Sequence, residues 1–368
     1  MSGRIAAAIS GLMFLTACQG STTPHPLANT SPIQIAPSPT STPTPSATPF
    51  PIPSFTDLPP SDQWNPNPTP SPGSSSGSGS TSVPYPKSMA SLGDSITAGF
   101  IANLKRGDWL NPDQVKDLVS ALYDIEVRGS DAVNRLEQRE LSWSGGLDGD
   151  VRSHAYRIKK KTGKIRVYNA AITGAEAKDV LDDELDKILS WARKELGQPA
   201  PDYVTLMIGP NDICAEKVSK MTSVADYSDR IDRIVKTLLD AYTGTRVLVN
   251  TIPAVDTLRN ALKDARAIAF GYSCSDLWKD TGLCPTLTTD DHDDDRKQIS
   301  QRLKDYNAAL ATIVTRYKNI YGDRVRLATK VYETSFDKDD MSVDCFHPNP
   351  RGQNKIADAS WKSSWWNF

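Results

Sequence analysis

The feature that most constrains the fold is an alternation of short β-rich runs with longer helix-like stretches. The helix-like stretches are 175–196, 225–242 and 296–318, and in the last of these apolar residues recur at helical spacing. Strands that alternate with helices form a parallel sheet covered by helices on both faces, so the sequence predicts an α/β domain. The runs expected to form strands are 88–92, 165–170, 203–208, 246–252 and 325–331.

Residues 1–17 have the pattern of an export signal. Arg4 places a positive charge near the start, and the apolar stretch after it is too short to span a membrane. The string LTAC at residues 15–18 resembles a bacterial lipobox, which implies cleavage before Cys18 and lipidation of that residue. The alternative is an ordinary signal peptide with an incidental cysteine. Gln19 follows the cysteine where Asp would imply inner-membrane retention, so the outer membrane is favoured.

Residues 18–86 are rich in proline, serine and threonine and close with a serine-glycine run. Such a composition cannot bury enough apolar surface to offset its ordering entropy, so we expect a disordered tether. The remaining segment, 87–368, has the length of one α/β enzyme domain, which we expect to act as a monomer. The formal net charge of −2 gives no electrostatic basis for binding nucleic acid.

Four short motifs follow one another in this domain. They are Gly93-Asp94-Ser95, Gly174, Gly209-Pro210-Asn211-Asp212 and Asp344-Cys345-Phe346-His347. The first three follow the first three expected strands. Because sites on parallel sheets form at the carboxyl ends of the strands, we expect Ser95, Gly174 and Asn211 to meet at one edge.

Together the motifs contain the parts of a serine esterase. Ser95 offers a hydroxyl, His347 can accept its proton, and Asp344 can fix the histidine tautomer and stabilise the imidazolium. The Gly174 N–H and the Asn211 side-chain amide can stabilise an oxyanion, and the Ser95 N–H can join them.

Each residue also has a purely structural reading. Ser95 could cap a helix, His347 could be a hydrogen-bonded core residue, and Asp344 could form a turn. Gly174 could simply permit a left-handed turn, which is compatible with an exposed N–H. Asp212 is expected to hold its loop by hydrogen bonds without taking part in the chemistry.

The acidic run 290–295 invites interpretation as a metal site, but its spacing fits neither a zinc site nor a calcium loop. We expect no metal there, because acidic residues before a helix starting near Arg296 oppose the positive helix end. This run contains His292, and His154 is expected on an exposed helix.

The chain has five cysteines, and four remain once Cys18 is set aside: Cys214, Cys274, Cys284 and Cys345. An even set in an exported domain predicts two disulfides, for which three pairings exist. The favoured pairing joins Cys274 to Cys284 and Cys214 to Cys345. The alternative for Cys345 is a nucleophilic thiol beside His347, but Ser95 already fills that role.

The four motifs resemble those of the SGNH hydrolases, also called the GDSL lipase/esterase superfamily. Further strings are similar to its phospholipase B subgroup: Ser142-Trp143-Ser144-Gly145-Gly146, Asn211-Asp212-Ile213-Cys214, Val343-Asp344-Cys345-Phe346-His347-Pro348 and Arg351-Gly352-Gln353-Asn354. The resemblance covers most of residues 88–358. It implies a three-layer α/β/α sandwich around a five-stranded parallel sheet, similar to flavodoxin.

The same resemblance implies ester hydrolysis through an acyl-serine intermediate, with no metal or organic cofactor. By position, it implies a triad of Ser95, Asp344 and His347 and an oxyanion hole formed by Ser95, Gly174 and Asn211. Pro210 departs from the small residue that relatives often carry there, and it stiffens the loop.

The sequence therefore predicts a lipid-anchored esterase of the bacterial envelope, facing the periplasm or the surface, that acts on phospholipids or lysophospholipids. One alternative is a carbohydrate O-acetyl esterase. An acyltransferase is another, because any nucleophile that outcompetes water can accept the acyl group. A binding protein on an inactive esterase scaffold is the alternative outside the enzymes.

Overall fold

A five-stranded parallel sheet forms the centre of the computed structural model, which describes residues 83–104, 131–268 and 272–367. Its strands are β1 (Ser88–Gly93), β2 (Arg166–Asn169), β3 (Tyr203–Met207), β4 (Arg246–Asn250) and β7 (Val325–Ala328). They follow the order β2-β1-β3-β4-β7, and each neighbouring pair is parallel. The predicted sheet is confirmed, with one strand at each expected run.

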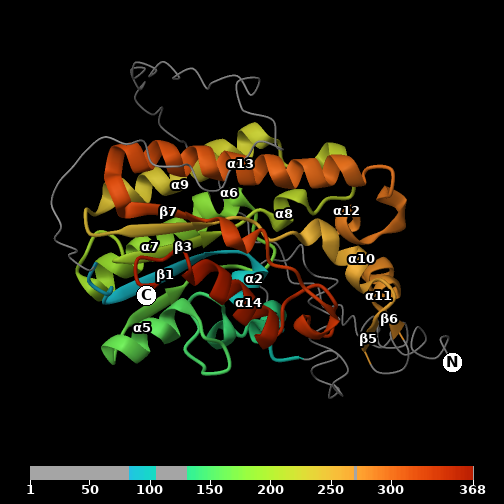
Figure 1. The fold of residues 1–368 in the computed structure, drawn as a ribbon, viewed down its shortest axis with the longest axis horizontal. Helices are drawn as coiled ribbons and strands as arrows, with labels where there is room; N and C mark the ends of the chain where they lie inside the picture. Colours follow the sequence, from blue (N-terminus) through green and yellow to red (C-terminus); the bar gives the residue numbers. More distant parts are fainter. Residues whose placement is uncertain (1–82, 105–130, 269–271, 368) are drawn as a thin grey trace, which may run out of the picture. The chain divides into compact units, whose positions relative to one another are not determined.

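Helices cover both faces of this sheet, which confirms the predicted α/β sandwich (Figure 1). The helices of one face are α6 (Ala177–Asp179), α7 (Leu185–Trp191), α9 (Val224–Ala241) and α13 (Arg296–Tyr321). Those of the other face are α2 (Ser95–Ala98), α5 (His154–Thr162) and α14 (Pro350–Trp361). The helix expected at 175–196 contains two π-helical turns, at Val180–Glu184 and Ala192–Leu196.

The side chains of the central strands explain why both faces are covered. In β3, Val204 and Leu206 pack among the residues of α9 and α13, whereas Tyr203 and Met207 pack among those of α5 and α14. Every residue of this strand is buried. A strand that is apolar on both faces is typical of a parallel sheet enclosed between two helical layers.

A third group of elements lies beyond the carboxyl ends of the strands. These are α4 (Asp131–Leu136), α8 (Pro210–Ile213), α10 (Leu258–Leu262), α11 (Cys274–Thr281), α12 (Pro285–Thr288) and an antiparallel pair, β5 (Arg266–Ile268) and β6 (Tyr272–Ser273). Leu262 and Trp278 of this group pack with Phe100 and Val343 in a separate apolar cluster. The sequence analysis did not predict this layer. None of the helices in the described ranges is long and apolar enough to cross a bilayer.

The structure forms two disulfides, but the favoured pairing was wrong. Cys214 bonds to Cys284, and Cys274 bonds to Cys345. Cys274 is the first residue of α11, and Cys284 follows the end of that helix. A helix of eight residues is about 12 Å long, well beyond the Cα separation that a disulfide can bridge. Short sequence separation misled the prediction, because a helix keeps the two residues apart.

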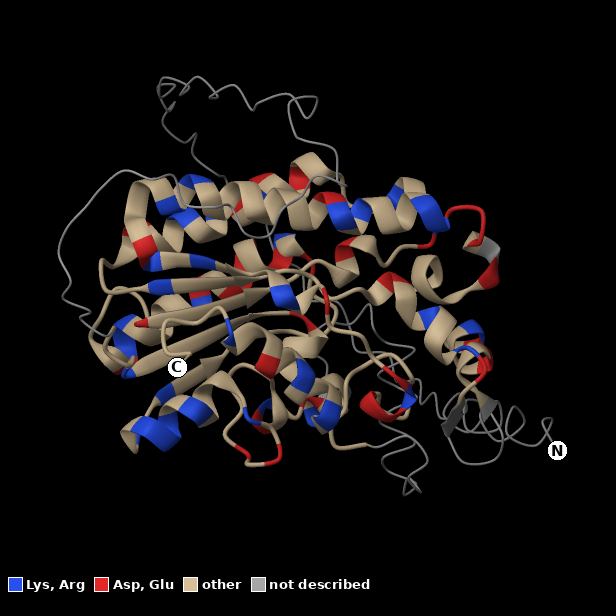
Figure 2. Ribbon diagram, viewed as in Figure 1, with Lys and Arg blue, Asp and Glu red and all other residues tan. Residues whose placement is uncertain are grey.

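The acidic run precedes α13, as expected, and Figure 2 shows it as a red loop before the blue start of this helix. Arg259, which is almost fully buried, forms ion pairs with Asp290 and Asp293. Arg296 pairs with Asp293 and donates to carbonyl groups of α12. Within the described residues, no group of three or more His, Cys, Asp or Glu side chains is arranged to hold a metal ion.

His154 is fully buried, so the expectation of an exposed helix position was wrong. Its Nδ1 lies 2.8 Å from the Tyr203 hydroxyl, and its ring packs edge-on against Trp143 and Trp361. Burial lowers the pKa of His154 to about 3, because the charged imidazolium would lose its hydration. The histidine is therefore a neutral core residue.

The disulfide pairing can be checked by peptide mapping. Digestion of the non-reduced protein with trypsin should cut at Lys279, between Cys274 and Cys284, and separate the two cystines. We expect one linked peptide pair containing Cys214 and Cys284 and another containing Cys274 and Cys345. A linked pair containing Cys214 and Cys345 would contradict the structure.

Burial of His154 predicts a loss of stability in acid. The unfolded imidazole has a pKa near 6.5 and the folded one near 3, so protons bind preferentially to the unfolded chain between these values. We expect this residue alone to cost about 2–3 kcal/mol between pH 7 and pH 4.5. Urea unfolding of the wild type and His154→Gln at both pH values isolates this contribution.

The exposed Lys159, on the same helix as His154, provides the matched control. Lys159→Gln should keep the pH dependence of the wild type. Equal losses of unfolding free energy in the wild type and His154→Gln would show that His154 does not titrate on unfolding.

Candidate active site

The turn between β1 and α2 presents Ser95. Gly93 has φ +153°, and a Cβ at this position would lie 2.4 Å from the carbonyl oxygen of Met207, so only glycine fits. Asp94 caps α2 by accepting a hydrogen bond of 2.9 Å from the Ile96 N–H. Ser95 is thus the first helical residue, and its own N–H has no acceptor within the helix.

The side chains of Ser95, His347 and Asp344 form a continuous hydrogen-bonded row. The Nε2 atom of His347 lies 2.8 Å from the Ser95 Oγ, and its Nδ1 lies 2.6 Å from the Asp344 Oδ2. All three residues are buried, and Asp344 has no exposed surface. An imidazole whose Nδ1–H donates to a carboxylate leaves Nε2 free to accept the serine proton.

The loop that carries Asp344 and His347 is fixed by its own backbone and by α11. The Asp344 Oδ1 accepts N–H groups from Phe346 and His347, each at 3.0 Å. The indole of Trp278 donates to the Asp344 carbonyl at 3.0 Å. The intervening Cys345, at φ +59°, is held by its disulfide to α11. Helix α11 therefore holds this loop both covalently and by hydrogen bonding.

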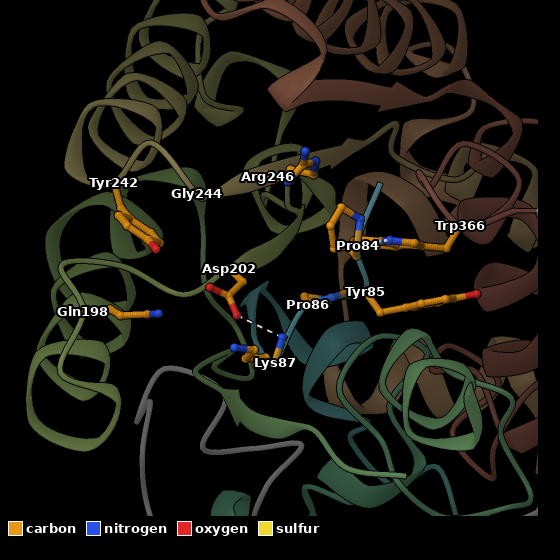
Figure 3. Close-up of a pocket in the computed structure, with 10 residues that line it drawn as sticks. All are labelled: Pro84, Tyr85, Pro86, Lys87, Gln198, Asp202, Tyr242, Gly244, Arg246 and Trp366. Atoms are coloured by element: carbon orange, nitrogen blue, oxygen red, sulfur yellow. Dashed lines mark hydrogen bonds between the residues drawn. The ribbon is translucent and has the colours of Figure 1, made fainter. Parts of the chain in front are cut away.

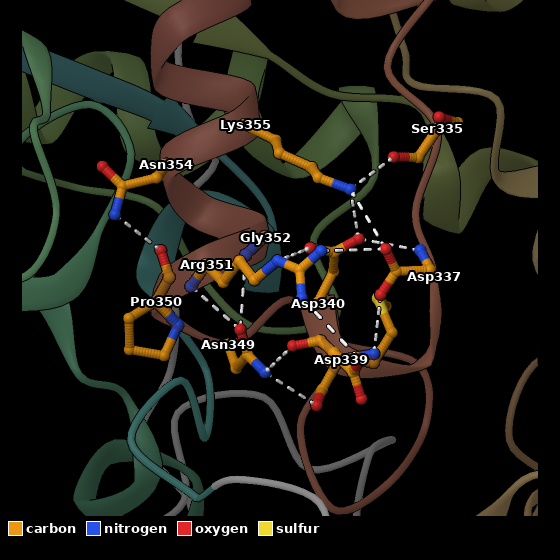
Figure 4. A network of polar contacts seen from close by, with 11 residues as sticks. Ser335, Asp337, Asp339, Asp340, Asn349, Pro350, Arg351, Gly352, Asn354 and Lys355 are labelled. Carbon is orange, nitrogen blue, oxygen red and sulfur yellow. Dashed lines mark hydrogen bonds and ion pairs between the residues drawn. The ribbon is translucent and has the colours of Figure 1, made fainter.

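The far end of the same loop is anchored by a charged network (Figure 4). Asp340 is fully buried and forms ion pairs with Arg351 and Lys355 of α14. Asn349 caps this helix and also donates to the Met341 carbonyl at 3.0 Å. His347 therefore lies between a disulfide on one side and a capped helix on the other.

Gly174 lies in the loop after β2, and Asn211 lies in α8, which begins shortly after the end of β3. Gly174 adopts φ +82°, which favours glycine. The Asn211 Nδ2 donates one hydrogen bond, of 2.9 Å, to the Ala175 carbonyl. An amide has two N–H groups, so the second remains for another acceptor. Pro210 begins α8, a position that proline suits.

Asp212 makes the kind of loop-holding contact expected from the sequence. Its Oδ2 accepts the Ala177 N–H at 3.0 Å, and its Oδ1 lies 3.7 Å from Arg230. Burial raises the pKa of Asp212 to about 7. Asn211 and Asp212 thus both bind the backbone that follows Gly174.

Two motifs that had no assigned role hold the backbone of α2. The buried Gln353 side chain donates to the Ile96 carbonyl and accepts from the Trp143 N–H, both at 2.9 Å. Ser142 and Asn169 donate to the Thr97 carbonyl at 2.7 and 2.8 Å. The Ile96 carbonyl also accepts the Gly99 N–H at 3.3 Å, so the Gln353 amide adds a second donor to it.

Two hollows on the surface of the described residues lie at opposite ends of the sheet strands. The larger, of about 710 Å³, runs along the edge strand β2 and reaches Ile172, close to Gly174; its lining includes Arg139, Leu147, Val167, Tyr168 and Lys187. The smaller, of about 230 Å³, lies at the amino ends of the strands (Figure 3). The lining of neither hollow includes Ser95, Gly174 or Asn211, and the larger one lies at the end of β2 that precedes Gly174.

Folding brings Ser95, Asp344 and His347 into contact, and it places Gly174 and Asn211 on the loops at the same edge of the sheet. Cys18 lies outside the described residues. Sequence analysis did not predict the contacts of Trp278 and Gln353, although Gln353 lies in a motif that was noted.

Comparison with known proteins agrees with this arrangement. Residues 89–360 match the family described as GDSL-like Lipase/Acylhydrolase. No curated protein matches the chain.

Several solved structures are similar at low identity. An extracellular lipase from Streptomyces rimosus is 15% identical, with a TM-score of 0.40 over 76% of this chain and 100% of that chain. A family 3 carbohydrate esterase from Clostridium thermocellum is 15% identical, with a TM-score of 0.37 over 75% and 94%. Phospholipase A1 from Streptomyces albidoflavus NA297 is 13% identical, with a TM-score of 0.38 over 76% and 100%.

These structural similarities are too distant to carry a substrate assignment. The family match covers most of the chain and spans the motifs from Gly93 to Asn354. The chain therefore belongs to the GDSL-like lipase/acylhydrolase family.

Proposed function

We propose that this protein is a serine ester hydrolase that acts on phospholipids or lysophospholipids through an acyl-enzyme at Ser95. The observation that carries the proposal is the hydrogen-bonded row from the Ser95 hydroxyl through His347 to Asp344. A serine hydroxyl is a weak nucleophile unless an adjacent base removes its proton. The 2.8 Å contact with Nε2 provides that base.

In the first half of the reaction, the Ser95 Oγ attacks the ester carbonyl carbon while His347 accepts the hydroxyl proton. The Asp344 carboxylate stabilises the resulting imidazolium. The negative oxygen of the tetrahedral intermediate accepts hydrogen bonds from the N–H groups of Ser95 and Gly174 and from the free N–H of Asn211. His347 then donates its proton to the departing alcohol, and the acyl group stays on the serine.

In the second half, water replaces the alcohol. His347 removes a proton from the water, which attacks the acyl carbonyl carbon, and the same donors stabilise the second oxyanion. Collapse of this intermediate returns the proton to the Ser95 Oγ and releases the carboxylic acid. His347 therefore acts first as a base and then as an acid in each half of the reaction.

Two features support a lipid substrate. The first is the resemblance of the strings Asn211-Asp212-Ile213-Cys214 and Arg351-Gly352-Gln353-Asn354 to the phospholipase B subgroup. The second feature is the lipobox-like string before Cys18, which lies outside the described residues and would keep the enzyme close to lipid.

The proposed location follows from the same terminal segment. Cleavage and lipidation at Cys18 would anchor the exported protein in the cell envelope, with the outer membrane favoured, and residues 18–86 would serve as the tether. The catalytic segment 87–368 would then work as a monomer at the membrane surface.

An ester panel tests the substrate class. We expect long-chain lysophospholipid to be hydrolysed with a higher kcat/KM than acetylated sugars or short p-nitrophenyl esters, and Ser95→Ala to be inactive on all of them. Strong preference for acetyl groups without lysophospholipid turnover would identify a carbohydrate O-acetyl esterase. Failure of a fluorophosphonate to label the wild type, where a control esterase reacts, would indicate a binding protein.

A charge-removing substitution tests the role of Asp344. Asp344→Asn should lower kcat by about 10⁴-fold, because the amide favours the wrong histidine tautomer. The matched control is Asp339→Asn, on the same loop, where the side chain is 58% exposed. Steady-state kinetics on p-nitrophenyl acetate, normalised to folded protein, should show near wild-type turnover for this control. Equal kcat values in the two variants would exclude the proposed triad.

A further inference from the structure

A buried carboxyl group with no role in the mechanism above lies between the ends of β1 and β2. Glu184 has no exposed surface, and no lysine or arginine of the described ranges forms an ion pair with it. Burial raises the pKa of Glu184 well above its usual range. Such a group is costly to retain unless its oxygens make good hydrogen bonds.

Both oxygens of Glu184 accept hydrogen bonds from backbone amides. The Oε2 accepts the Gly93 N–H at 2.9 Å, and the Oε1 accepts the Ile172 N–H at 3.2 Å. Gly93 lies two residues before Ser95, and Ile172 lies two residues before Gly174. The Ile172 N–H also donates to the Gly93 carbonyl at 3.1 Å. One carboxyl group and one backbone hydrogen bond therefore join the two turns whose N–H groups serve the proposed oxyanion hole.

A second observation points to the same residue. Glu184 ends the π-helical turn Val180–Glu184 that interrupts the helix between α6 and α7. Single π turns are rare within helices and occur frequently at functional sites. The neighbouring Asp183 is half-exposed and pairs with Lys187 at 2.6 Å, so the two adjacent acids differ completely in environment.

We propose that Glu184 is a positioning residue that sets the separation of the Ser95 and Gly174 N–H groups. An oxyanion hole works only if its donors are held where the charge develops, so a small displacement of either turn weakens both donors at once. Glu184 acts through the backbone and does not touch the substrate. The inference rests on the proposed ester hydrolysis and is independent of the lipid assignment.

Two substitutions test this role on the full domain. Glu184→Gln keeps the shape but turns one acceptor into a donor that faces a backbone N–H. Glu184→Asp keeps the acid but is one methylene shorter, so it cannot reach both amides. Asp183→Asn is the matched control on the same turn. For each protein, fluorophosphonate titration of active sites removes any effect of partial unfolding from the measured kcat.

We expect kcat on p-nitrophenyl acetate to fall by about 10-fold or more in both variants, with KM within about twofold of wild type. The Ki of a boronic acid, which forms a tetrahedral adduct on the serine, should rise by a similar factor. A merely structural role would lower the melting temperature without moving the titrated kcat or Ki. The control variant Asp183→Asn should have the kcat and the Ki of the wild type.

Titrated kcat and Ki values within twofold of wild type in both variants would overturn the proposal. Failure of both variants to fold would make Glu184 a folding determinant and would equally reject the positioning role. If the wild type neither hydrolyses esters nor reacts with the fluorophosphonate, the proposed function fails, and this inference fails with it.

Discussion

One hydrogen bond, between the Ser95 hydroxyl and the His347 imidazole, joins side chains that are 252 residues apart in the chain. The parallel sheet brings only part of the site together, because Ser95, Gly174 and Asn211 each follow a strand end. His347 follows no strand directly and is brought to the sheet by a loop. The accuracy of this one contact therefore depends on what holds the loop.

Two kinds of support hold the parts of the site. The loop with His347 is held by two helices. Its Cys345 forms a disulfide with α11, and its buried Asp340 forms ion pairs with α14. The turn with Ser95 is held by two buried side chains. Gln353 donates a hydrogen bond to a carbonyl of α2, and Glu184 accepts one from the Gly93 N–H. Buried side chains that satisfy backbone groups in this way restrict movement more than apolar contacts do.

The sequence predicted what depends on local pattern and could not predict what depends on tertiary packing. Strand runs and motif order are local, and they gave the sheet and the group of residues around Ser95. The disulfide pairing failed because the residues between Cys274 and Cys284 form a helix that holds them apart. His154 looked like a surface residue because its helix carries several lysines, yet it faces the core. The burial of Glu184 could not be predicted from the sequence, because an acidic residue in a helical stretch usually faces solvent.

Both cystines end on the segment that contains α11 and α12, one from the loop with Asn211 and the other from the loop with His347. A newly made chain in a reducing cytosol would lack both cross-links and so would hold neither loop covalently. Reduction would therefore loosen the Asn211 side and the His347 side of the site together.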